Sequence, residues 1–328
     1  MTNNSPSKRA SNDAASDGEE SLAEYKRSEA FWLRDGNVIL VAEKIAFRVH
    51  QSVLERKSVV FQDMFGVPQP ENVETLEECP LVHVSDAAED IKHMLSVLYD
   101  GDRFLNLQSN ISMKMVFALL QLGIKYQIDY LRDEAISVIK FVYPPSYDEY
   151  MENNAERVTE QSYADDAIAV INLAWKHGLH SLLPSAFFVC ALMSNQELAE
   201  ATGRQGLTKL SPNDLRRCLD GREILQTRYH DRYHPLDCVI VSEFCLNPED
   251  CDWEVRDTWS HDAWDCTTSI LEFDFDIMKE LDWIKAAHLC EACRTHYEYA
   301  DQEARKDMYN DLAVIFGLEK FMQGDVDA

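Results

Sequence analysis

The chain has 328 residues, and 46% of them are hydrophobic, which is typical of a globular protein with about two domains. Its 58 acidic residues against 31 basic ones give a net charge of −27, which disfavours contact with the phosphates of nucleic acids. The longest apolar run, Ala186–Met193, is far shorter than the roughly 20 residues that a membrane helix needs. We therefore expect neither a nucleic-acid partner nor a membrane partner.

The N-terminal segment, residues 1–24, is polar throughout and lacks the apolar core of a secretory signal. We expect it to be a disordered acidic arm. The chain contains nine cysteines, an odd number. Because no export signal accompanies them, the thiols are expected to stay reduced, which predicts a cytoplasmic or nuclear protein.

The first ordered elements are predicted as strands. "NVILVA" (37–42) and "IAFRVH" (45–50) are rich in β-branched and apolar residues, which predicts a hairpin. Apolar residues then recur at helical spacing from Ser52 until Gly66 ends the run. "PLVHVS" (80–85) predicts a third short strand.

Polar residues at the predicted helix starts indicate N-caps. Ser52 and Asp86 each precede a glutamate by three residues, the spacing of a capping box. Ser58 and Ser112 also stand directly before apolar helical runs. All four are predicted to cap the helices that follow them.

A pair of apolar helices, 113–126 and 129–142, is followed by a similar pair. Residues 116–135 align without gaps on residues 167–186, with identical residues at several positions. Chance similarity of two amphipathic helix pairs is the alternative. We expect an acidic linker over 144–166, a helical extension over 167–202 and a cysteine-bearing, mainly helical region over 203–322.

Residues 47–65, "FRVHQSVLERKSVVFQDMF", contain the residue types of a catalytic triad in His50, Ser52 and Asp63. The serines are better placed as helix caps, and no glycine-rich turn for a nucleophile stands nearby. The stretch is therefore interpreted as scaffold. The sequence predicts no catalytic residue, and the protein is not expected to be an enzyme.

The same stretch resembles the start of a BTB/POZ domain, in which an Asp precedes the first strand and F-x-x-H ends the second. The matching residues are Asp35, Phe47, His50, Leu54, Ser58, Phe61, Met64 and Phe65. Residues 99–101 resemble the family's Tyr-x-Gly turn, and the helix pair that follows resembles its closing helices. Gly123 stands where the family often has Ala. The resemblance covers about residues 31–143.

In detail the sequence motifs are similar to those of the BTB proteins of mushroom-forming fungi. The shared motifs are "DGNVILVA", "VPQP", "EECPLV" and the later Phe316-Gly317-Leu318. The resemblance implies an α+β fold, with a small sheet flanked by helices, followed by a mainly α-helical C-terminal region. It implies a fungal protein-interaction module.

The resemblance also implies an interface between two copies of the chain. Its candidate residues are Phe31, Trp32, Asp35, His50 and Val53, of which Asp35 and His50 lie near a partner-peptide groove in some members. For Phe31 and Trp32, core packing is the alternative. A cullin-type ubiquitin ligase scaffold is the alternative partner, which would make the chain a substrate adaptor. The loop after Tyr99, "YDGDRFLNL", lacks the hydrophobic-x-Glu motif of such adaptors.

The C-terminal region carries a candidate zinc site. "HLCEACRTH" contains the C-x-x-C pair Cys290 and Cys293, and a structural zinc ion needs four ligands. The other ligands are sought among Cys238, Cys245, Cys251, Cys266 and His261, and Cys238 and Cys266 are the predicted pair. The alternatives are small hydrophobic residues on a packed helix face, or redox chemistry.

Overall fold

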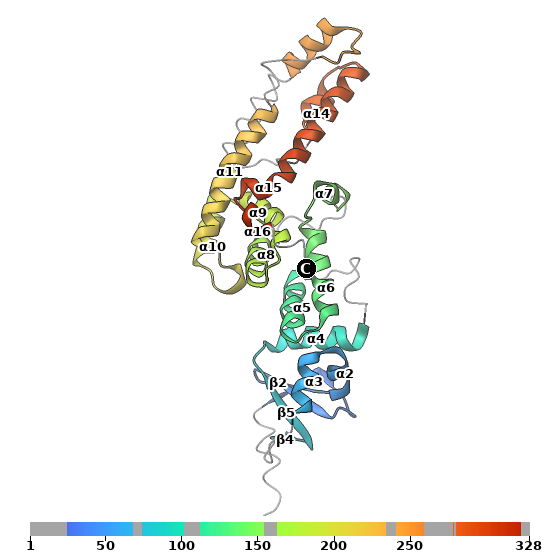
Figure 1. Cartoon of the computed structure of the whole chain (residues 1–328), viewed down its shortest axis with the longest axis vertical. Coiled ribbons are helices and arrows are strands. Elements are labelled where there is room, and N and C mark those ends of the chain that lie inside the picture. Colours follow the sequence, from blue (N-terminus) through green and yellow to red (C-terminus); the bar gives the residue numbers. More distant parts are fainter. Residues whose placement is uncertain are drawn as a thin grey trace, which may run out of the picture. The chain divides into compact units, whose positions relative to one another are not determined.

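The computed structural model describes residues 25–67, 74–101, 112–153, 163–233, 241–258, 278 and 280–322 (Figure 1). The chain divides into two compact units, Met1–Val138 and Ile139–Ala328. Within the described part, none of the helices combines the length and apolar character needed to cross a membrane.

The first unit is built on a five-stranded sheet with the strand order β1-β3-β2-β5-β4. β2 pairs antiparallel with β3 and parallel with β5, and every residue of β2 is buried. The predicted hairpin and third strand are confirmed, whereas β1 and β4 add edge strands that the pattern did not predict. The strands are β1 (Lys26–Trp32), β2 (Val38–Ala42), β3 (Ile45–Val49), β4 (Thr75–Leu76) and β5 (Cys79–Val84).

Helices complete this unit and share its aromatic core with the strands. The Phe61 ring is fully buried and stacks on the Tyr126 ring with 4.6 Å between centroids. The helix pair predicted over 113–142 is confirmed. The helices are α2 (Gln51–Lys57), α3 (Val59–Gly66), α4 (Ala88–Asp100), α5 (Met113–Lys125) and α6 (Asp129–Val142), the last of which continues into the second unit.

Two of the four predicted helix caps are confirmed. The Ser112 hydroxyl accepts from the Met115 backbone N–H at the start of α5. The Ser58 hydroxyl accepts from the Phe61 N–H at 3.0 Å and donates to the Tyr126 carbonyl at 2.6 Å. Ser58 therefore caps α3 and also ties it to the turn between α5 and α6.

The capping predictions for Ser52 and Asp86 were wrong, because more distant side chains bind the amides at both helix starts. α2 begins at Gln51, whose N–H donates to the Asn37 side-chain oxygen at 2.9 Å. At α4 the Ala88 N–H donates to Glu43 at 3.3 Å. The Asp86 carboxylate instead accepts from the Lys125 ammonium and the Tyr126 hydroxyl.

Gly123 permits close packing between α5 and α6. A β-carbon at this position would lie 2.7 Å from the Arg132 backbone nitrogen, closer than real side chains come. The Ala that often stands here in the resembling family would therefore require the two helices to move apart.

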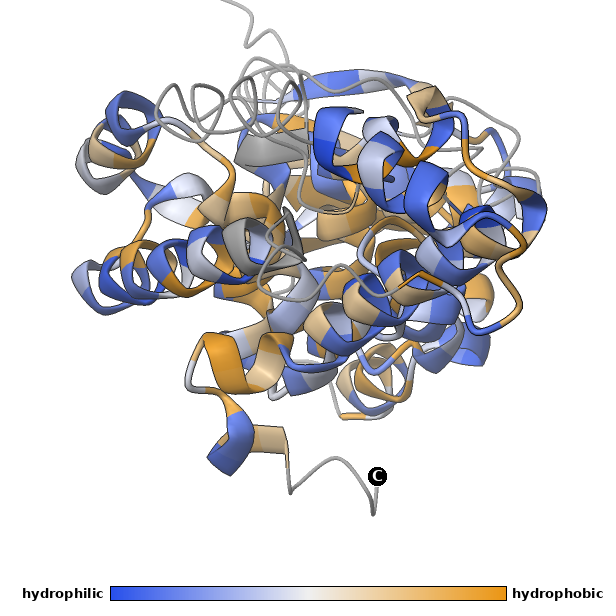
Figure 2. Ribbon diagram, turned by 90° about the horizontal axis from the view of Figure 1, so that it is seen from above, coloured by the Kyte–Doolittle hydropathy of each residue, from blue (hydrophilic) through white to orange (hydrophobic). Residues whose placement is uncertain are grey.

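The second unit is helical in its described part. α8 and α9 pack against one another, which confirms the predicted second helix pair. Figure 2 shows blue and orange segments mixed along most helices, as expected for amphipathic helices. The helices are α7 (Tyr147–Asn153), α8 (Tyr163–His177), η3 (His180–Leu182), α9 (Leu183–Ala191), α10 (Asn195–Gly203), η4 (Gly206–Thr208), α11 (Pro212–Tyr233), an unlabelled helix over 248–258, α13 (Asp282–Ala286), α14 (Glu291–Asn310), α15 (Leu312–Ile315) and α16 (Glu319–Met322).

The acidic segment was expected to be a linker, either solvated or an exposed helix, and in its first part α7 forms a helix that packs against α14. Tyr147 and Tyr150 are buried, because their rings join an aromatic cluster with Tyr309. The Tyr309 hydroxyl donates to the Pro144 carbonyl at 2.7 Å. The acidic side chains of α7 face solvent while its tyrosines belong to the core of the second unit.

The Phe-Gly-Leu sequence ends α15 and holds it to the helical core. The Phe316 ring is buried, lies 5.6 Å from the Phe187 ring and rests on Gly221, where any side chain would overlap it. Gly317 has φ +62°, a conformation that glycine adopts without strain. Its turn lets the Leu318 N–H reach the Ala313 carbonyl at 2.7 Å.

Candidate functional site

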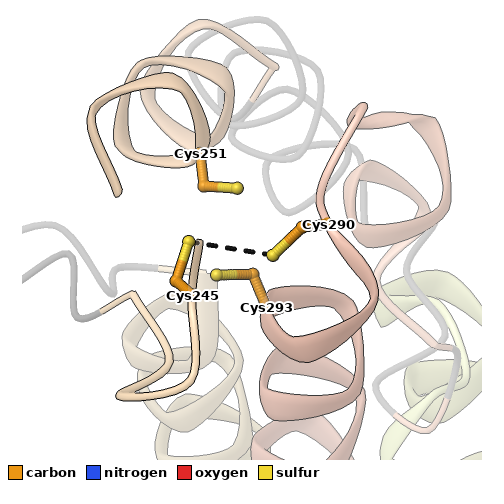
Figure 3. A group of neighbouring side chains, drawn as sticks. All are labelled: Cys245, Cys251, Cys290 and Cys293. Carbon is orange, nitrogen blue, oxygen red and sulfur yellow. Dashed lines mark hydrogen bonds between the residues drawn. The ribbon is translucent and has the colours of Figure 1, made fainter. Parts of the chain in front are cut away.

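Four cysteines from two helix starts converge in the second unit (Figure 3). Cys245 lies in the loop before the helix over 248–258, and Cys251 lies in the first turn of that helix, its N–H donating to Asn247. Cys290 is the N-cap residue of α14, and Cys293 lies in its first turn. Each half of the cluster thus pairs a cysteine before a helix with a cysteine one turn inside it.

The geometry of the four sulfur atoms fits a single metal ion. All four Sγ atoms lie within 4.8 Å of one another, and those of Cys245 and Cys290 are 3.7 Å apart. An ion bound tetrahedrally at about 2.3 Å from each sulfur would separate neighbouring sulfurs by roughly 3.8 Å. A disulfide would need about 2.05 Å, and all four cysteines are free thiols.

The local electrostatics favour a thiolate at Cys290. The backbone N–H of Cys293, in the first turn of α14, lowers the pKa of the Cys290 thiol to about 7. Burial raises the pKa of the Cys293 thiol to about 12 and also raises the pKa of Cys251. Since metal ions bind thiolates, Cys290 offers an ionised ligand near neutral pH, and ligation would displace the protons of the other three.

A small apolar core lies against the cluster. Cys251 and Cys293 belong to it, and the rings of Trp283 and Tyr297 meet edge-on in it at 5.2 Å. A backbone hydrogen bond also joins the two halves, since the His288 N–H donates to the Glu254 carboxylate at 3.0 Å. These helices are therefore connected by the cysteines, by the apolar core and by this hydrogen bond.

Of the four cysteines predicted to bind zinc, the structure brings Cys290 and Cys293 together. Cys238 and Cys266 lie outside the described residues, as does His261. The structure places Cys245 and Cys251, both named as candidates, beside the C-x-x-C pair. Five residues separate them, which hides them from a search for short cysteine spacings, but Asn247-Pro248 marks a helix start between them.

In the first unit, His50 is held between Asp35 and Tyr99 rather than by a serine. Its Nε2 lies 3.3 Å from the Asp35 carboxylate, and its Nδ1 lies 3.2 Å from the Tyr99 hydroxyl. The same hydroxyl accepts from the His50 backbone N–H at 2.8 Å. Ser52 and Asp63 are exposed on α2 and α3. These residues form a strand-to-helix junction and not a catalytic triad.

The other predicted interface residues differ in how much side chain they leave exposed. Phe31 is buried, with its ring 6.0 Å from that of Tyr99, so it packs in the core. Trp32 is half-buried beneath the Arg27 guanidinium, and Val53 is half-buried on α2. Val59, at the start of α3, was not among the predicted interface residues, and its side chain is 52% exposed.

The comparisons with known proteins identify the first unit. Residues 33–141 match the family model of the BTB/POZ domain. No curated protein matches the chain. The matched range contains β2–β5 and α2–α5 with nearly all of α6, so the small sheet with its helices is a BTB domain, followed by a mostly helical C-terminal region. BTB domains are protein-interaction domains and are generally not catalytic.

Proposed function

We propose that this chain, with a BTB/POZ domain at residues 33–141, acts in protein–protein interaction and forms a homodimer through that domain. The family match is the observation that carries the proposal. The dimer face includes Val53 and Val59 on α2 and α3, with Trp32 at the end of the edge strand β1. A symmetric interface of this kind buries the same aliphatic patch of both copies.

Native mass spectrometry of the full chain tests the dimer, with an expected mass of twice 37.7 kDa. Val59→Asp is expected to give monomers, because a carboxylate would be buried at the interface without a partner. Val314→Asp is the matched control, since Val314 is 53% exposed on α15 and Val59 is 52% exposed. A wild-type monomer, or equal loss of dimer in both variants, would contradict the proposal.

The alternative partner is a cullin-type ubiquitin ligase scaffold. The loop after Tyr99 that would carry the contact falls in residues 102–111, which lie outside the described residues. A substrate adaptor would co-purify with the scaffold and would lose it when this loop is replaced. Dimer formation without the scaffold would leave the homodimer as the function of the domain.

We also propose that Cys245, Cys251, Cys290 and Cys293 hold a structural zinc ion. The convergence of four Sγ atoms at the spacing of a tetrahedral site supports this. Four sulfur ligands suit zinc or iron among biological metals, and a site closed by four protein ligands is structural rather than catalytic. Zinc would stabilise the folded state of this small core, because the free energy of metal binding adds to the free energy of folding.

Metal analysis of chelator-free protein tests this second proposal. One zinc ion per chain is expected, and Cys251→Ala is expected to abolish it. Cys79→Ala is the matched control, because Cys79 is also buried, at 5% exposure against 3% for Cys251, but lies on β5 in the first unit. Cys251→His should restore binding, since imidazole is itself a zinc ligand. Metal-free wild type under reducing conditions would overturn the proposal.

A further inference from the structure

A groove lies on the surface beside the four cysteines. It has a volume of about 720 Å³ and runs between two walls, both described in the structure. Residues 241–244, directly before Cys245, form one wall, and the outer face of the first turns of α14 forms the other. Cys245 directly follows the first wall in sequence and Cys290 directly precedes the second, and their sulfurs lie 3.7 Å apart. The width of the groove therefore depends on the proposed zinc centre.

The groove exposes large apolar side chains. Phe244 on one wall is 74% exposed, and Tyr299 on the other is 63% exposed. Leu246 and Trp253, which are close to Cys245 and Cys251 in sequence but do not line the groove, are 90% and 62% exposed. Exposed aromatic side chains on both walls of a groove are typical of protein-binding surfaces.

The charge of the groove restricts what can occupy it. Glu243 and Glu291 contribute one carboxylate to each wall, and neither lysine nor arginine lines it among the described residues. The neighbouring Arg294 points elsewhere, since its guanidinium donates to the Ala287 carbonyl. In a chain whose net charge is −27, these two carboxylates would repel the phosphates of a nucleic acid, and they would also repel the same groove of a second copy.

We propose that the groove binds a peptide segment of another protein in which an aromatic or aliphatic residue is flanked by lysines or arginines. The apolar residue packs between Phe244 and Tyr299, and the basic residues pair with Glu243 and Glu291. Because the walls are held by the cysteines, this inference rests on the proposed zinc centre. It assigns the C-terminal region an interaction surface of its own.

Fluorescence anisotropy with the full-length, zinc-loaded protein tests the proposal. The probe is a fluorescein-labelled twelve-residue peptide with a central tryptophan and leucine between lysines, compared with the same peptide carrying glutamate for each lysine. We expect saturable, micromolar binding of the lysine peptide that weakens with salt, and no binding of the glutamate peptide. Equal binding of both peptides, or of neither, would overturn the proposal.

Charge reversal locates the site. Glu243→Lys combined with Glu291→Lys is expected to weaken binding of the lysine peptide by about tenfold or more, because like charges then face each other. Glu200→Lys combined with Glu223→Lys changes the net charge equally at exposed positions on α10 and α11, and should leave binding within about twofold. Equal effects of the two double variants would show general attraction to an acidic protein and would overturn the proposal.

Two further readouts separate this inference from the proposals beneath it. Zinc is counted in the same samples, so zinc-loaded protein that does not bind the lysine peptide overturns only the groove. Chelator-free protein that contains no zinc as purified but still binds the lysine peptide overturns only the zinc centre. Sedimentation of the Glu243→Lys, Glu291→Lys variant addresses a second copy as the occupant. An unchanged oligomeric state is expected, and a change would assign the groove to self-association instead.

Discussion

The BTB domain and the region around the four cysteines are stabilised by different kinds of interaction. The BTB domain surrounds a fully buried central strand, β2, and adds polar ties such as Ser58 that satisfy buried backbone groups. The core around Cys251 and Cys293 joins α14 to the helix over 248–258 and to α13, and four convergent thiols lie beside it. The first region draws its stability from apolar burial, whereas the second has a smaller apolar core to which the proposed zinc ion would add stability. This difference can be tested directly.

Chelation should give the largest effect, and only in the second unit. Removal of zinc is expected to expose the amides of the helix over 248–258 and of the first turns of α14, while β2 keeps its protection. Acidification should release zinc in the same way, because thiolates become protonated as pH falls. Hydrogen exchange with mass spectrometry measures both effects. Loss of protection in β2 on chelation would contradict the expected difference between the BTB domain and the cysteine region.

Phe316→Ala should give the next largest effect, at the centre of the second unit away from the cysteines. The ring is buried against Phe187 and Gly221, so its removal leaves a cavity and should cost about 3–5 kcal/mol of unfolding free energy. Urea denaturation measures the change. Val314→Ala, at an exposed neighbouring position, should change stability by less than about 0.5 kcal/mol. Similar losses in both would mean that Phe316 is not a core residue.

Gly123→Ala should destabilise the BTB domain. The new methyl group would meet the Arg132 backbone nitrogen, and overpacking of this kind costs about 1–3 kcal/mol. Gly66→Ala is the control, because a β-carbon at the end of α3 meets no other atom within 4 Å. Thermal melts compare the two variants. If Gly123→Ala left the melting temperature unchanged, α5 and α6 would be able to move apart without loss of stability. That outcome would contradict the prediction and would fit the Ala that is common here in the resembling family.

Ser58→Ala should give the smallest of these effects. It removes the α3 cap and the hydrogen bond to the Tyr126 carbonyl, which together should cost about 1–2 kcal/mol. Ser52→Ala is the control, because Ser52 is exposed within α2 and its replacement should change the unfolding free energy very little. If Ser52→Ala proved the more damaging, the local capping pattern would describe α2 better than its contact with Asn37 does.

Local patterns predicted the elements whose causes are local. The β-branched and apolar residues of 37–50 predicted the hairpin, and helical spacing predicted α5, α6, α8 and α9. Ser58 and Ser112 were predicted correctly because each cap bonds an amide three residues away. The fold of residues 33–141 was therefore largely readable from the sequence.

Features fixed by distant contacts were not predicted. The start of α2 depends on Asn37, and Asp86 is occupied by Lys125 and Tyr126, so the capping-box pattern failed at Ser52 and Asp86. At the cysteines, sequence spacing identified Cys290 and Cys293, whereas the other two predicted ligands, Cys238 and Cys266, lie outside the described residues. Proximity across the fold places Cys245 and Cys251 beside the C-x-x-C pair.

The two halves of the cysteine cluster are far apart in sequence, because residues 252–289 lie between Cys251 and Cys290. A metal ion that joins them closes this segment into a loop. The entropy of loop closure grows only with the logarithm of loop length, so doubling the connection would cost about 0.6 kcal/mol. The segment can therefore lengthen, shorten or accept an inserted sequence at little thermodynamic cost, while the helix starts that carry the four sulfurs must keep their places.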